Sequence, residues 1–93
     1  MMILRTPNEM AVDAAERFRS MRKAKKITIK ELSRRSGVPY STVRRFESTG
    51  EVSFVALVKM TSAMDEDRQI ADLFSNRVPS SIEEVIRANT GQA

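Results

Sequence analysis

Apolar positions along the chain recur every three or four residues, which is the spacing of helices that bury one face. Strand-like alternation of apolar and polar residues is absent, with Met1 to Leu4 as the one candidate exception. The pattern predicts five helices in succession, then a linker from Asn76 to Pro79 and a sixth short helix. We therefore expect an all-α fold: a five-helix domain with a short C-terminal helical extension.

The first helix is predicted to start at Pro7 and to end near Ala24 or Lys26. Thr6 is suited to cap it, Pro7 fits its first position, and Glu9 completes a capping box. Its Lys- and Arg-rich last turn suits the negative end of the helix dipole. The apolar positions of its inner face are Ala11, Ala14, Ala15, Phe18 and Met21.

Residues 28–50 predict two short helices joined by a tight turn, which is the layout of a helix-turn-helix. Thr28 is expected to cap the first of these helices, and Glu31 to complete a second capping box. Gly37 follows the last turn, where a left-handed residue is often needed. The residues expected to fix both helices against the core are Leu32, Val38, Val43 and Phe46.

The second helix of this pair is predicted from Pro39 or Tyr40 to Ser48, with Gly50 ending it. At 100° per residue, its polar positions fall on the side opposite Val43 and Phe46. An arginine on such a face suits guanine edges or phosphates, because its planar fork donates two hydrogen bonds at once. The polar residues of this face are Ser41, Arg44, Arg45 and Ser48.

Two more helices complete the predicted domain. One starts at Ser53, and the other is capped by Asp65 and runs from Glu66 to about Phe74. Their expected apolar stripes are Phe54, Leu57, Val58 and Met64, then Ile70, Leu73 and Phe74; a narrower stripe of Ile82, Val85 and Ile86 marks the sixth helix. The predicted organisation is an N-terminal arm (1–6), a DNA-binding domain (7–75, motif 28–50) and a C-terminal extension (76–93).

The amino-acid composition lacks the residues on which most enzyme active sites depend. The 93 residues include no cysteine and no histidine, so thiolate and imidazole catalysis and the usual zinc sites are excluded. Asp65, Glu66 and Asp67 are better explained as a helix cap with first-turn acids than as a metal site. We expect no enzyme activity, no metal and no cofactor. With no long apolar run and no signal-peptide pattern, we expect a cytoplasmic protein with no membrane partner.

Charge is unevenly distributed. The net charge is +4, but residues 16–49 hold eleven Lys and Arg against three Asp and Glu, a local charge of +8, and the remainder carries −4. Such a basic segment favours a nucleic-acid partner, although an ordinary solvated basic surface is the alternative. Single-stranded RNA is disfavoured, because the chain lacks an aromatic stacking platform.

Residues 14–74 resemble the Cro/lambda-repressor-type, or XRE-type, helix-turn-helix family. The residues that match its pattern are Arg22, Ile27-Thr28-Ile29, Leu32-Ser33, Ser36-Gly37-Val38-Pro39, Thr42-Val43, Phe46-Glu47 and Gly50. The resemblance implies a lambda-repressor-like domain that binds double-stranded DNA. It also implies a partly buried ion pair between Arg22 and Glu47. The residues expected to contact DNA are Thr28, Ile29, Tyr40, Ser41, Thr42, Arg44 and Arg45.

Three positions depart from the family. Ile29 stands where Gln is usual and lacks its hydrogen bonds to DNA, Ser33 replaces Ala, and Pro39 replaces Ser. Other basic residues keep two interpretations: Arg34 and Arg35 fit solvated helix surface better than base contacts. For Lys23, Lys25 and Lys26, phosphate contacts and plain solubilising charge remain equally open, and Arg45 is suited either to DNA or to pairing with a neighbouring acid.

The resemblance implies a transcriptional regulator, expected to repress as a homodimer on a near-palindromic operator. In this family, C-terminal helices frequently form the dimer contact. The alternative is a type II antitoxin similar to HipB-like proteins, which binds a toxin protein and also represses its own operon. Its basis is the small size and the two ends, Met1 to Arg5 and Ser80 to Ala93.

Overall fold

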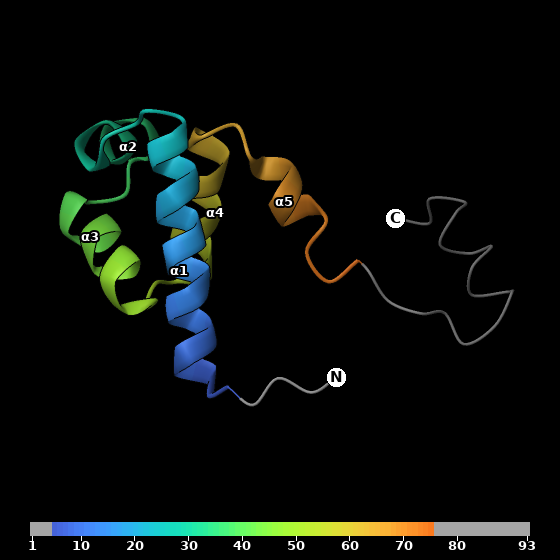
Figure 1. Ribbon diagram of the computed structural model, residues 1–93. Helices are drawn as coiled ribbons and strands as arrows, with labels where there is room; N and C mark the ends of the chain where they lie inside the picture. The colour runs from blue at the N-terminus through green and yellow to red at the C-terminus, as the bar shows by residue number, and fades with distance from the viewer. Residues whose placement is uncertain (1–4, 76–93) are drawn as a thin grey trace, which may run out of the picture.

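The computed structural model describes residues 5–75, and this part of the chain is helical without any strand. The predicted all-α, five-helix lambda-repressor-like fold is confirmed (Figure 1). None of the described helices is long and apolar enough to span a bilayer. The elements are α1 (Pro7–Ala24), α2 (Ile29–Ser36), α3 (Tyr40–Thr49), α4 (Phe54–Ala63) and α5 (Asp67–Ala71).

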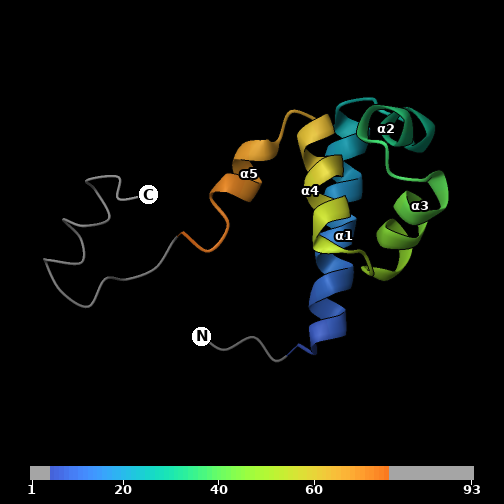
Figure 2. The same ribbon diagram turned by 180° about the vertical axis from the view of Figure 1, so that it is seen from behind.

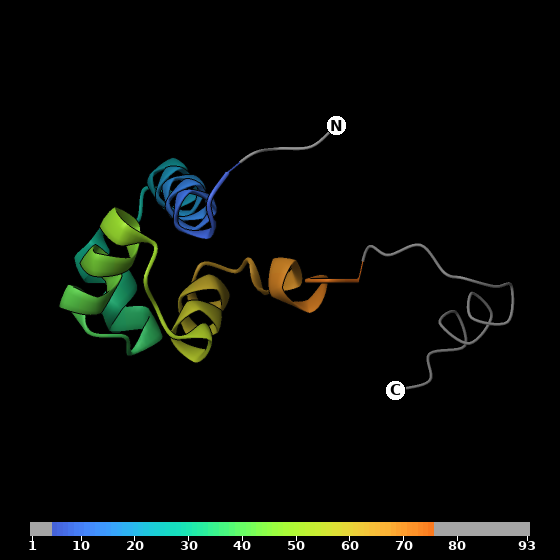
Figure 3. The same ribbon diagram turned by 90° about the horizontal axis from the view of Figure 1, so that it is seen from below.

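Helix α1 is the longest element, with 18 residues, and the helices pack in a chain of neighbouring pairs. Helix α3 packs against α1 and α2, and α2 also packs against α4. Helix α5 contacts α4 and lies on the side of the molecule away from α3, as the two opposite views show (Figures 1 and 2). The view along α1 shows the same separation (Figure 3). One side of the domain therefore presents α3, and the other presents α5.

The predicted helix starts are largely confirmed. Thr6 and Glu9 form a complete capping box, with both hydrogen bonds at 2.9–3.0 Å. The Ser53 hydroxyl accepts the Ala56 amide at the start of α4. At α2 only half of the predicted box forms: Thr28 caps the Glu31 amide, but the Glu31 carboxylate turns to the arginines one turn later. A charged partner at that spacing gives a stronger hydrogen bond than the Thr28 amide.

The core follows the predicted inner faces of α1, α2 and α3. Phe18 and Phe46 meet edge to face, with ring centroids 5.0 Å apart. The prediction for α4 is wrong in part: Phe54 is 55% exposed, Val58 is half-buried, and Met60, absent from the predicted stripe, is fully buried. Ala14 on α1 is also exposed rather than inward. The buried core residues are Ala15, Phe18, Ile27, Leu32, Val38, Val43, Phe46, Met60 and Met64.

Helix α5 is shorter than predicted. It spans Asp67–Ala71, with Glu66 at the N-cap position, whereas Asp65 adopts a left-handed conformation (φ 61°) and is not the cap. Leu73 and Phe74 lie beyond the helix and are 41% and 88% exposed. Phe74 itself adopts a left-handed conformation (φ 63°), which a helix cannot continue through. The predicted elements at Met1 to Leu4 and at Ile82 to Ile86 lie outside the described residues.

Gly50 closes α3 where two helices come closest. It is left-handed (φ 81°), and a Cβ there would lie 2.7 Å from the backbone carbon of Ala11. Gly37 is also left-handed (φ 77°), but a Cβ there would meet open space. Both glycines therefore need a left-handed backbone, but only at Gly50 would a side chain also collide with a neighbouring helix.

We expect Gly50→Ala to destabilise the domain by about 1–2 kcal/mol for backbone conformation and by about 1–3 kcal/mol more for overpacking. Gly37→Ala, the matched control, incurs only the first cost. Urea denaturation of both variants measures the difference. Equal losses of stability would contradict the close approach of α1 and α3 at Gly50.

Candidate nucleic-acid interface

The turn between α2 and α3 is held by three hydrogen bonds. The Gly37 amide donates to the Ser33 carbonyl at 2.9 Å. The Ser33 hydroxyl donates to the Val38 carbonyl at 2.6 Å, and the Ser36 hydroxyl accepts the Val38 amide at 3.1 Å. Val38 is buried. Ser33, where the family usually has Ala, thus closes the turn and fixes the angle at which α3 leaves it.

Arg22 and Glu47 form a buried bidentate ion pair between α1 and α3. Nε and Nη2 of Arg22 donate to the two Glu47 oxygens at 2.7 and 2.8 Å. Nη1 donates to the Ile27 carbonyl at 2.7 Å, just before α2. The residues are 5% and 8% exposed, so water screens the pair little. This pair, implied by the family resemblance, connects all three elements around the motif.

Helix α3 buries one face and exposes the other. Val43, Phe46 and Glu47 are buried, whereas Tyr40 is 47% exposed and Ser41 is also exposed. Pro39 occupies the N-cap position without a side-chain cap. Among residues 5–75 the first two amides of α3 find no acceptor, so they are available to an anion at this end. Thr42 is half-buried in the same turn.

The two arginines of α3 differ in their surroundings. Nη2 of Arg45 lies 2.5 Å from Oε1 of Glu51, in a pair whose side chains are 69% and 64% exposed. Arg44 is exposed, and no carboxylate within the described chain pairs with it. Sequence reasoning left a neighbouring acid open for Arg45 but did not identify Glu51, which lies beyond the Gly50 turn.

The start of α2 is less available. The Thr28 hydroxyl accepts the Glu31 amide as the helix cap, and its proton remains free to donate. Ile29 is half-buried and packs against the core. This packing accounts for an apolar residue where the family usually has Gln. The Thr28 hydroxyl and the exposed edge of Ile29 are therefore the groups that this pair offers to a partner.

Carboxylates also hold basic residues outside α3. Glu31 pairs with Arg34 at 2.5 Å and with Arg35 at 2.8 Å, and their hydrogen bonds lower the pKa of Glu31 from 4.5 to about 2. Glu66 pairs with Lys25 at 2.9 Å, which together with a hydrogen bond from Gln69 lowers the pKa of Glu66. Glu66 lies outside residues 16–49 and therefore offsets one of their charges, whereas Glu31 is already counted in the +8.

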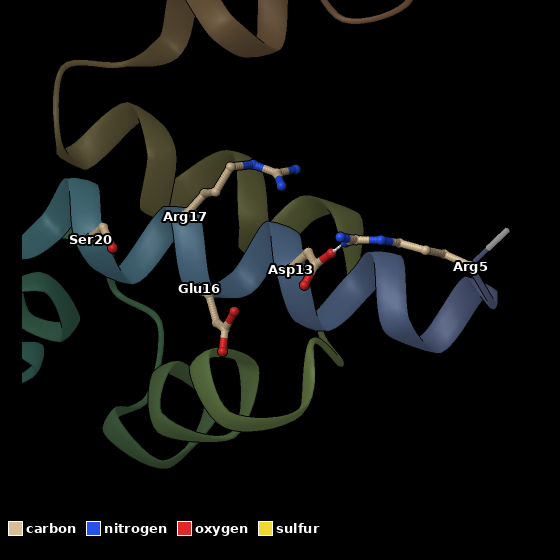
Figure 4. Close-up of a pocket in the computed structure, with 5 residues that line it drawn as sticks. All are labelled: Arg5, Asp13, Glu16, Arg17 and Ser20. Carbon is tan, nitrogen blue, oxygen red and sulfur yellow. Dashed lines mark ion pairs between the residues drawn. The ribbon is translucent and has the colours of Figure 1, made fainter. Parts of the chain in front are cut away.

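A shallow hollow lies along α1 (Figure 4). Arg5 reaches back to pair with Asp13, which ties the start of the described chain to the helix. Glu16, Arg17 and Ser20 complete its wall. Its acids and bases are mixed and it is open to solvent, so it has neither the enclosure nor the aligned groups of an active site. Residues 5–75 also contain no group of acids that would hold a metal ion.

Comparison with known proteins adds one finding. A family model described as helix-turn-helix, of the XRE type, matches residues 18–70, which include α2, the turn, α3 and α4. Neither a curated protein nor a solved structure shows significant similarity to the chain.

Replacing one partner of the buried pair leaves the other charged and uncompensated. We expect Glu47→Ala to cost about 3–5 kcal/mol of unfolding free energy. Glu51→Ala is the matched control, because it removes the partner of an exposed arginine and should cost less than about 1 kcal/mol. Thermal or urea denaturation gives both values. Similar losses in the two variants would show that the Arg22–Glu47 pair does not organise the domain.

Proposed function

The chain belongs to the XRE-type helix-turn-helix family of DNA-binding transcription regulators, and from this premise we propose that it represses transcription by binding a near-palindromic operator as a homodimer. In this arrangement two copies of α3 enter successive major grooves, about 34 Å apart. The exposed face of α3 makes the base contacts, and the remaining basic residues add phosphate contacts.

Arg44 carries this proposal. It is exposed on α3, opposite the buried Val43 and Phe46, and it pairs with no acid of residues 5–75. A free guanidinium on a helix fixed by its other face is suited to bidentate contact with guanine O6 and N7. We assign Tyr40 and Ser41 to neighbouring base or backbone contacts at the leading end of the helix, with Thr28 and Thr42 as phosphate donors. Arg45 and Ile29 are secondary contacts.

Repression itself is proposed from the small size of the domain, which blocks a promoter simply by occupying it. A reporter promoter that carries the selected operator should lose expression when the protein is produced. Expression that rises instead would show activation.

We expect Arg44→Ala to weaken operator binding by about 1–3 kcal/mol and to relax the base preference at one position of each half-site. The probe is a duplex recovered from a random pool by selection on the purified protein, and fluorescence anisotropy gives the Kd. Arg34→Ala is the control, since it removes the same charge from an arginine held by Glu31. If Arg44→Ala keeps both affinity and base preference, Arg44 is not the reading residue.

The proposed dimer contact is the α4–α5 apolar surface, made by Phe54 and Val55 of α4 and by Leu73 and Phe74 after α5. Their exposures are 55%, 62%, 41% and 88%, which is unusual for four large apolar side chains in a small domain. Phe54 and Leu73 line the same groove. Because α5 lies away from α3, a second copy that binds here leaves the α3 helix of each copy, which we call the recognition helix, free to contact DNA (Figures 1 and 3).

Phe74→Asp should convert a dimer into a monomer, because a carboxylate in an apolar contact loses its hydration without gaining a partner. Sedimentation equilibrium measures the mass. Met10→Asp is the control: it adds the same charge at an apolar residue that is 52% exposed but lies outside this surface. A wild-type mass that corresponds to one chain would contradict the dimer.

The second candidate function is that of a type II antitoxin, which is compatible with repression of its own operon. Its structural support is the same apolar groove of about 710 Å³ between α1, α4 and α5, to which a toxin would bind in place of the second copy. A toxin-like reading frame beside the gene favours this function. So does co-purification with a larger partner that is lost when residues 79–93 are deleted, whereas a protein that purifies alone from its natural operon argues against it.

A further inference from the structure

Glu51 is placed beside Arg45 by the backbone and not only by its own flexible side chain. The Thr49 hydroxyl donates to the Arg45 carbonyl at 2.7 Å and accepts the Glu51 amide at 3.1 Å. The left-handed Gly50 between them donates its amide to the Phe46 carbonyl at 2.7 Å. The turn after α3 thus brings an acid back onto the last exposed arginine of the helix.

Stability does not account for this arrangement. Both side chains of the pair are about two-thirds exposed, and exposed ion pairs contribute little to folding. The pair instead lowers the positive charge on the exposed face of α3. Glu51 neutralises Arg45, while Arg44 one residue earlier keeps its full positive charge.

The pair lies on the wall of a shallow hollow, about 450 Å³ in volume, beside the recognition helix. Ser41 and Thr42 line the hollow together with Arg45, Glu51 and Ser53. The hydroxyls and the guanidinium are donors that suit a phosphate, whereas the carboxylate repels one. A DNA backbone that reaches this hollow must therefore displace Glu51 from Arg45 or bind against its charge.

We propose that Glu51 competes with DNA phosphate for Arg45 and thereby weakens the electrostatic part of DNA binding. Binding without sequence preference is almost wholly electrostatic, so it depends on every available cation. Operator binding also draws on base contacts such as those assigned to Arg44, which no described acid opposes. The competition therefore takes a larger share of the binding free energy from non-operator DNA, although it lowers both affinities by the same factor. This inference rests on the proposed function, since it presumes that α3 faces DNA.

The test is Glu51→Gln, which keeps the shape of the side chain and removes its charge. The first probe is a mixed-sequence duplex of about two helical turns, and the second is the selected operator duplex. We expect the variant to bind the mixed-sequence duplex about five-fold more tightly at low salt. The slope of log K against log salt should steepen by about 0.9, as for one additional phosphate contact. Operator affinity should rise by a similar factor, because the same phosphate contact adds the same free energy to both complexes.

Two controls separate competition from a simple change of net charge. In an Arg45→Ala background, Glu51→Gln should raise the mixed-sequence affinity less than it does in the wild type, because only the direct repulsion of phosphate is removed, and it should not steepen the salt slope. Asp72→Asn makes the same change of charge at the end of α5, away from α3, and should alter neither probe by as much (Figure 2). Circular dichroism and thermal melting establish that each variant is folded.

An equal gain in the Arg45→Ala background, an equal gain in Asp72→Asn, or no gain in Glu51→Gln would each overturn the inference. If operator binding by the wild type still depends on Arg44 in those cases, the proposed function stands without it. If the wild type binds neither duplex, the proposed function fails and the inference falls with it.

Discussion

The buried contact between Arg22 and Glu47 is the constraint on which the motif depends. Three guanidinium nitrogens are satisfied at 2.7–2.8 Å by a carboxylate on α3 and by the Ile27 carbonyl before α2. Buried charges are tolerated only with such complete pairing. Because α3 is a rigid helix, fixing Glu47 inward beside Val43 fixes the opposite face outward. The direction of Arg44 is thus set by an interaction that never touches DNA.

Local signals predicted most of the scaffold. Thr6, Ser53, Gly37 and Gly50 act where capping and turn preferences place them, because these preferences depend on neighbouring residues alone. The pair of Arg22 with Glu47 is different. Its members are 25 residues apart, and no spacing rule connects them, so only the family resemblance indicated it.

Two features of the domain could not be predicted from the sequence and became visible only in the structure. Periodicity identified α4 and α5 as apolar on one face, but it does not specify what covers that face. Phe54 and Leu73 continue their stripes past the edge of the core and remain exposed. Glu51 was also missed, because a left-handed glycine turn brings it onto Arg45. The predicted capping box at Glu31 was likewise incomplete, because its carboxylate accepts hydrogen bonds from Arg34 and Arg35 instead of the Thr28 amide.

The distribution of acids changes the meaning of the basic composition. Residues 16–49 carry a charge of +8, in which Glu31 and Glu47 are already counted. Glu51 and Glu66, from outside this segment, pair with two more of its basic side chains. Composition alone would spread DNA contacts over the whole segment. With those partners in place, Arg44 is the arginine of α3 that no described acid pairs with. The placement of carboxylates thus decides which arginines are free to meet an anion as much as the placement of the arginines does.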